Sequence, residues 1–218
     1  MFSGVAAALT RLLHPEMGDG EVDRLVFVSL PAGMLGSYLL SAVATWWLLV
    51  RRYRLPLWPA LGLARVPGPE LLRPFLGGVA LQFLSALFLL FEPPPEDQQL
   101  IFEIFLKGGP ASLAFLFLIA VLLAPAMEEI LFRGLLLPVL RWHFGFAIAA
   151  LAVTVLFALL HGFQTGPYWP ALLAIFVCGW ILAWLRERHG TLWPSIAFHA
   201  GFNFTAFVPV LFFGAKLQ

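Results

Sequence analysis

Two adjacent glutamates, Glu128 and Glu129, lie in the apolar stretch APAMEEILFRG, which also contains Arg133. Ionisable side chains inside a membrane are costly and are usually paired or functional. On a helix, Glu129 and Arg133 share one face in the order that favours an ion pair, whereas Glu128 points about 100° away. The spacing predicts that Arg133 neutralises Glu129 as structural support and that Glu128 is available for chemistry. The alternative is an ion cluster that only pins helices together.

Three more polar residues interrupt later apolar stretches. His161 ends the segment LFALLHG, and His199 and Asn203 lie four residues apart, on one helix face. A carboxylate and a histidine can hold and deprotonate a water molecule, and a second histidine with an amide can stabilise a developing oxyanion. Together these groups suit hydrolysis of an amide bond. Alternatively, His161 is an interfacial residue, and His199 and Asn203 are hydrogen-bonding contacts between helices.

A metal ion would be another use for the same side chains. If the chemistry depends on metal, Glu128, His161 and His199 are the expected ligands of one Zn²⁺. The sequence lacks the HExxH spacing typical of zinc proteases. We therefore assign no metal ligand and favour a water molecule activated by glutamate without metal.

The composition indicates where these residues must lie. Hydrophobic residues make up 61% of the 218 positions and charged residues 11%, whereas soluble domains are about half apolar and about a quarter charged. The chain is therefore expected to be an integral, multi-pass membrane protein with the lipid bilayer as its surroundings. A net charge of +1 gives no electrostatic case for a nucleic-acid partner.

The apolar stretches predict an all-α, polytopic membrane bundle of about six transmembrane helices. The expected spans are 25–50, 72–91, 111–141 with a break or bend near Pro125, 145–161, 168–185 and 192–213. Residues 1–110 hold two spans and an interfacial segment at 98–107 but no assigned motif, and residues 111–218 hold all the candidate site residues.

Arginines cluster after the first, third and fifth spans. The positive-inside rule places these clusters in the cytoplasm and both termini outside. Measured from the arginine-bearing ends by helical rise, His199 lies about 15 Å deep, Glu128 about 20 Å and His161 about 24 Å. A single cluster of the three therefore requires tilted or kinked helices.

The chain resembles the CPBP family of intramembrane proteases, which includes the type II CAAX prenyl endopeptidases. The family motifs EExxxR, FxxxH and HxxxN occur in order as Glu128-Glu129-x-x-x-Arg133, Phe157-x-x-x-His161 and His199-x-x-x-Asn203, within 111–207. The resemblance implies that Glu128 and His161 activate water, that His199 and Asn203 stabilise the oxyanion, and that Glu129 and Arg133 support them.

The resemblance implies a peptidase, glutamate- or metal-dependent, that cleaves a membrane-associated protein or peptide in a bacterial or archaeal plasma membrane. Nothing in the sequence identifies a site for a prenyl group. The alternative is a non-catalytic scaffold or immunity protein of the same family. A proton-coupled transporter would also bury Glu and His, but the chain has no inverted repeat and too few spans for two halves.

Overall fold

The computed structural model describes residues 19–63, 66–89, 109–165 and 168–213, and these are helical with short connections. The elements are α2 (Asp19–Trp46), η1 (Trp47–Arg52), α3 (Leu57–Ala60), α4 (Gly68–Leu89), α6 (Gly109–Phe117), η3 (Leu118–Leu123), α7 (Ala124–Glu129), η4 (Ile130–Leu136), α8 (Leu137–Thr165), α9 (Trp169–His189) and α10 (Trp193–Phe213). The predicted interfacial segment at 98–107 lies outside the described residues. The prediction of an all-α membrane bundle is confirmed.

The helix that carries the two glutamates is irregular on both sides of them. The π-helical turns η3 and η4 flank the short α7, in which Pro125 stands at the first turn. The chain remains helical through Pro125, although proline has no N–H group to donate. The sharp change of direction comes later, at Gly145, whose φ of 76° and ψ of 169° interrupt α8.

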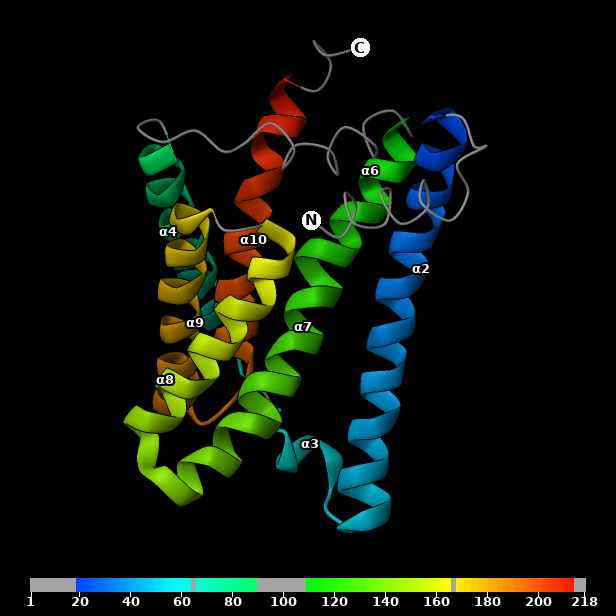
Figure 1. The fold of residues 1–218 in the computed structure, drawn as a ribbon. Coiled ribbons are helices and arrows are strands. Elements are labelled where there is room, and N and C mark those ends of the chain that lie inside the picture. The colour runs from blue at the N-terminus through cyan, green and yellow to red at the C-terminus, as the bar shows by residue number, and fades with distance from the viewer. Residues whose placement is uncertain (1–18, 64–65, 90–108, 166–167, 214–218) are drawn as a thin grey trace.

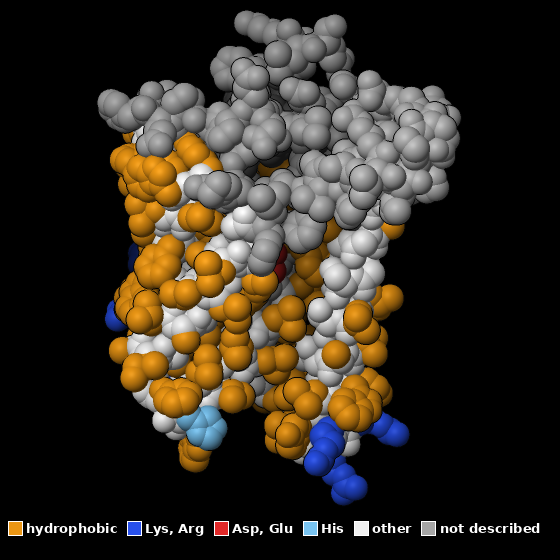
Figure 2. All heavy atoms as spheres, in the orientation of Figure 1, with side chains coloured by type: hydrophobic (Ala, Val, Ile, Leu, Met, Phe, Trp, Pro, Cys, Tyr) orange, Lys and Arg blue, Asp and Glu red, His pale blue; other side chains and the backbone are white. Residues whose placement is uncertain are grey.

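Four helical stretches of the described chain are long and apolar enough to cross a membrane: Ala32–Arg52, Gly68–Phe88, Gly109–Gly162 and Trp169–His189. The third has 54 residues and passes through the corner at Gly145, so it contains the third and fourth predicted spans. Helix α10, which carries His199 and Asn203, is not among the four. Large apolar side chains are exposed on the outer faces (Figure 2), including Leu40, 70% exposed. The protein is an integral membrane protein.

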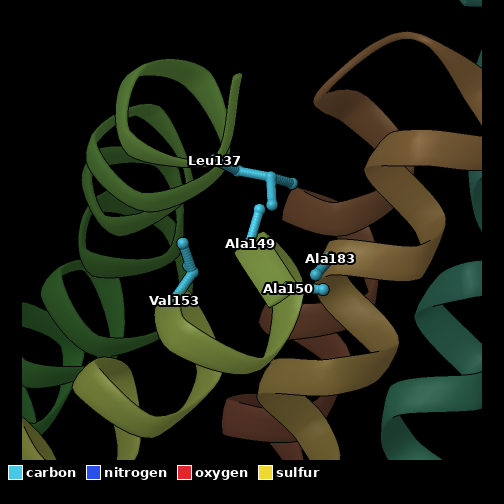
Figure 3. Packing of buried hydrophobic residues seen from close by; sticks show 5 residues of the cluster. All are labelled: Leu137, Ala149, Ala150, Val153 and Ala183. Atoms are coloured by element: carbon cyan, nitrogen blue, oxygen red, sulfur yellow. The ribbon is translucent and has the colours of Figure 1, made fainter. Parts of the chain in front are cut away.

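Small residues lie where α4 packs against α10 and where α8 packs against α9. Gly78 of α4 lies against the Phe198 carbonyl, and Gly201 of α10 lies against the Phe75 carbonyl. A Cβ atom at either glycine would collide with backbone, so α10 is held tightly on α4. Helices α8 and α9 meet through a buried apolar cluster (Figure 3) that includes three alanines: Leu137, Ala149, Ala150, Val153 and Ala183. Such contacts are typical of helix packing in membranes.

The arginine-bearing connections lie together at one end of the bundle (Figure 1, lower end). Arg141, near the start of α8, pairs with Glu187, near the end of α9, at 2.8 Å. The Leu192 N–H, in the turn before α10, donates to the Gly62 carbonyl at 2.8 Å. Figure 2 shows further Lys or Arg side chains at the same end, below α2. This shared end fits helices that alternate in direction, and its cytoplasmic location stays a prediction.

Candidate active site

Glu128 faces two histidines that come from different helices. Its Oε2 atom lies 3.7 Å from His161 Nε2, on α8, and 3.8 Å from His199 Nε2, on α10. Both distances exceed a direct hydrogen bond and suit a water molecule between the groups. The Oε2 atom is buried and accepts no hydrogen bond from the described residues. The three side chains therefore converge on a point where a small polar molecule could bind.

The other ring nitrogen of each histidine determines which nitrogen carries the proton. His161 Nδ1 lies 2.8 Å from the Phe157 carbonyl oxygen, and His199 Nδ1 lies 3.1 Å from Glu129 Oε1. Because both oxygens can only accept, each Nδ1 must donate. Each neutral ring then presents an unprotonated Nε2 towards Glu128. Three acceptors that face one another need a donor between them, either a water molecule or a proton on one ring.

Glu129 and Arg133 form a fully buried ion pair beside the point where Glu128 faces the two histidines. Arg133 Nη1 donates to Glu129 Oε1 at 2.9 Å, and both side chains are 0% exposed. Arg133 Nη2 also donates to the Gly179 carbonyl of α9 at 2.9 Å. Glu129 Oε1 thus accepts from both Arg133 and His199, which fixes the His199 ring. The pair links α7 and η4 to α9 and α10.

Phe157 is the aromatic centre of the site. Its ring centroid lies 4.3 Å from that of His161 and 5.7 Å from that of His199, and the Arg133 guanidinium carbon lies 4.5 Å from it. The ring is 2% exposed. It packs the two imidazoles and the guanidinium against one surface, which explains why a bulky aromatic side chain precedes His161 by one helical turn.

Asn203 makes a backbone contact rather than a contact with Glu128. Its Nδ2 donates to the Ala120 carbonyl of η3 at 2.8 Å. In η3, the Ala124 N–H donates five residues back, to Ile119. The next donor in this register would be residue 125, but Pro125 has no N–H. The Asn203 side-chain amide therefore donates to the Ala120 carbonyl in place of the missing N–H of Pro125. Pro125 lies three residues before Glu128.

This arrangement predicts that the effects of changes at Asn203 and Pro125 depend on each other. Asn203→Ala leaves the Ala120 carbonyl without its donor and should lower stability by about 1 kcal/mol. In a Pro125→Ala background the restored N–H can serve that carbonyl, so the same change should cost less. Thermal unfolding of the two single variants and the double variant measures the difference. An equal loss in both backgrounds would contradict this role for Asn203.

Some residues beside the site are difficult to identify from the sequence alone. Gly179 contributes its backbone carbonyl, and a Cβ at this position would lie 3.2 Å from Thr154 Cγ2 and 3.4 Å from Arg133 Nη2. Ser195 donates to the Leu182 carbonyl at 3.0 Å, so its hydroxyl is engaged on the backbone.

Within the described residues, no three His, Cys, Asp or Glu side chains are arranged to hold a metal ion. The donor types of Glu128, His161 and His199 would suit zinc, but their present arrangement does not fit it. We therefore derive no step through a metal.

Residues 110–205 match the family described as "Type II CAAX prenyl endopeptidase Rce1-like". No curated protein and no solved structure matches the chain. The matched segment contains the two glutamates, both histidines and Asn203. The match over residues 110–205 supports the resemblance of this segment to the CPBP family of proteases, which includes the type II CAAX prenyl endopeptidases.

Proposed function

We propose that the protein is an intramembrane endopeptidase in which Glu128 activates a water molecule. One observation carries the proposal. A buried carboxylate oxygen without a hydrogen-bond partner among the described residues faces two imidazole Nε2 atoms, at 3.7 and 3.8 Å. A water at that point would satisfy the carboxylate and lie beside a general base.

The proposed reaction begins with transfer of a water proton to Glu128 as the water oxygen attacks the scissile carbonyl carbon. The carbonyl π bond then becomes an oxyanion. When His199 is protonated, its Nε2–H donates to that oxygen, and the buried Glu129 carboxylate at its Nδ1 stabilises the imidazolium. Collapse of the intermediate breaks the C–N bond. The proton held by Glu128 passes to the leaving nitrogen, directly or through His161.

The two glutamate side chains differ in how much of their surface is exposed, as the proposed reaction requires. The Glu128 and His161 side chains are 20% and 21% exposed, whereas Glu129 and Arg133 are fully buried. The Glu128 side chain is therefore partly open to its surroundings, whereas the Glu129–Arg133 pair is closed off. The Asn203 amide uses one N–H on the Ala120 carbonyl. Its second N–H is the one we assign to the oxyanion.

The proposed substrate is a membrane-associated protein or peptide of a bacterial or archaeal plasma membrane. The direct test reconstitutes the purified chain in liposomes with a membrane-protein fraction and identifies new N-termini by mass spectrometry. We expect new N-termini within or beside apolar segments. If the new N-termini do not exceed those found with a Glu128→Gln preparation, the proposal is overturned and a non-catalytic scaffold is favoured.

Metal content provides a separate prediction. We expect active protein to contain less than one zinc per chain and to keep its activity after dialysis against a chelator. The reason is that Glu128 and the two Nε2 atoms can hold a water by hydrogen bonds alone. The measurement is elemental analysis of the preparation used for the cleavage assay. Stoichiometric zinc, with activity lost to the chelator and restored by zinc, would assign Glu128, His161 and His199 as its ligands instead.

A further inference from the structure

A cavity of about 410 Å³ lies at the arginine-bearing end of the bundle, between the first part of α8 and the end of α9. Its wall includes Leu137, Arg141, Trp142, Phe146, Arg186 and Glu187. Leu137 also belongs to the α8–α9 core cluster in Figure 3, so the cavity lies directly on packed helices. Its volume is within the range of small-ligand sites.

The charges of the cavity favour an anion. Two guanidinium groups and one carboxylate line it, and the remaining lining side chains are apolar. Arg141 Nη2 pairs with Glu187 Oε1 at 2.8 Å. The lining residues include no second carboxylate that could pair with Arg186. Its buried Nε also lacks a hydrogen-bond partner among the described residues. A water molecule, an ion or another acceptor from outside the chain can satisfy a buried donor of this kind.

The Arg186 side chain lies close against the backbone of a neighbouring loop. A Cβ on Gly62 would lie 2.5 Å from Arg186 Nη2 and 2.8 Å from its Cζ. Gly62 also has a φ of +70°, which favours glycine. The loop therefore leaves space for the guanidinium where any other residue would push it away. A guanidinium suits a phosphate group, because its planar fork can donate two hydrogen bonds at once.

The cavity lies at a membrane boundary. Arg186 is three residues from the end of the span Trp169–His189. The neighbouring Trp142 is 86% exposed, and tryptophan is enriched at the level of lipid headgroups. Apolar lining continues from the charged groups towards Leu137 and Phe146. A ligand with both an anionic group and an apolar part fits this combination.

We propose that this cavity binds the phosphate-containing headgroup of an anionic phospholipid, with Arg186 and Arg141 on the phosphate and the apolar wall against the first acyl carbons. Basic pockets between membrane helices on the cytoplasmic side are suited to such headgroups. The site is separate from Glu128 and does not depend on peptidase activity.

The test is native mass spectrometry of the full chain released from mixed micelles of phosphatidylglycerol and phosphatidylcholine. The wild type should retain phosphatidylglycerol preferentially. Arg186→Gln and Arg141→Gln should each reduce this retention about fivefold. Glu187→Gln removes the competing carboxylate and should increase it. Because a general charge effect would also give opposite signs for arginine and glutamate changes, a matched arginine control decides between a specific site and general loss of charge.

Arg188→Gln is the matched control, because it removes the same charge from the same helix end. Arg188 lies over the Trp184 ring, with its guanidinium carbon 5.5 Å from the ring centroid, and does not line the cavity. Its retention of phosphatidylglycerol should equal that of the wild type. An equal loss in all three arginine variants would overturn the proposal. Arg141 is 55% exposed, so its variant should fold even if Arg186→Gln does not.

Soluble anions distinguish a lipid from free phosphate. Inorganic phosphate and glycerol phosphate are added separately to detergent-purified protein, and thermal unfolding is followed. Phosphatidylglycerol should raise the unfolding temperature in an Arg141-dependent manner, while the soluble anions should not. If inorganic phosphate gives the same Arg141-dependent rise, the cavity is a soluble-anion site and the lipid assignment fails.

Discussion

Replacing Glu128 by glutamine is expected to abolish cleavage while the protein still folds and accumulates. Glutamine keeps the shape of the side chain but cannot take a proton from water. Positioned general bases contribute about 10²–10⁴-fold to rate, so the loss should be at least about 100-fold. Because Oε2 makes no hydrogen bond to the described residues, the substitution should disturb little of the packing. The measurement is cleavage of one membrane-anchored substrate, normalised to folded protein.

Glu129→Gln is the matched comparison, since it makes the same chemical change one residue later. Glu129 is fully buried and accepts from Arg133 and His199. Its loss leaves Arg133 without its carboxylate partner, and so should mainly lower stability. Residual turnover per folded molecule should exceed that of Glu128→Gln. If Glu128→Gln remained active and Glu129→Gln were stable but inactive, the roles assigned to the two glutamates would be reversed.

The sequence was most informative where a contact is local. Glu129 and Arg133 are four residues apart, and the helical spacing alone puts them on one face. The all-helical membrane fold also followed from the apolar stretches and is confirmed. The spans are long and the charged residues few, so these predictions depend on composition and helical rise rather than on packing.

The meeting of Glu128 with His161 was harder to predict, because it depends on several helices at once. Counting helical rise put His161 deeper than Glu128, yet the two side chains lie 3.7 Å apart. The count assumed straight, parallel helices. The structure has π-helical turns on both sides of α7, and each changes where a side chain falls. These turns have no periodic signal in the sequence, whereas the corner at Gly145 coincides with the predicted boundary between the spans 111–141 and 145–161.

The contact of Asn203 with the backbone cannot be predicted from the sequence for a related reason, since it too depends on an irregular helical turn. The HxxxN spacing showed that His199 and Asn203 share a face, but not that the amide would serve a backbone carbonyl. That carbonyl, at Ala120, lacks a donor because a π-helical register meets a proline. A proline in an apolar stretch was visible in the sequence, whereas the register of the preceding turn was not.

Replacing Arg133 by methionine is expected to destabilise the protein strongly. The change leaves the Glu129 carboxylate buried without its cation and the Gly179 carbonyl without its donor. Breaking a buried ion pair on one side typically costs about 3–5 kcal/mol. For a protein of this size that corresponds to a fall of about 10 °C in the unfolding temperature. The measurement is thermal unfolding of purified protein in detergent.

The control removes both charges. In Glu129→Leu/Arg133→Met no unpaired charge is left behind, and apolar replacement of a buried pair is often close to neutral. The double variant should therefore be more stable than Arg133→Met alone, although His199 loses its acceptor and activity should remain low. A double variant as unstable as the single one would show that packing of the Arg133 side chain against Phe157, rather than its charge, holds the helices. Arg133→Met with normal stability but no turnover would instead place Arg133 among the groups that act on the substrate.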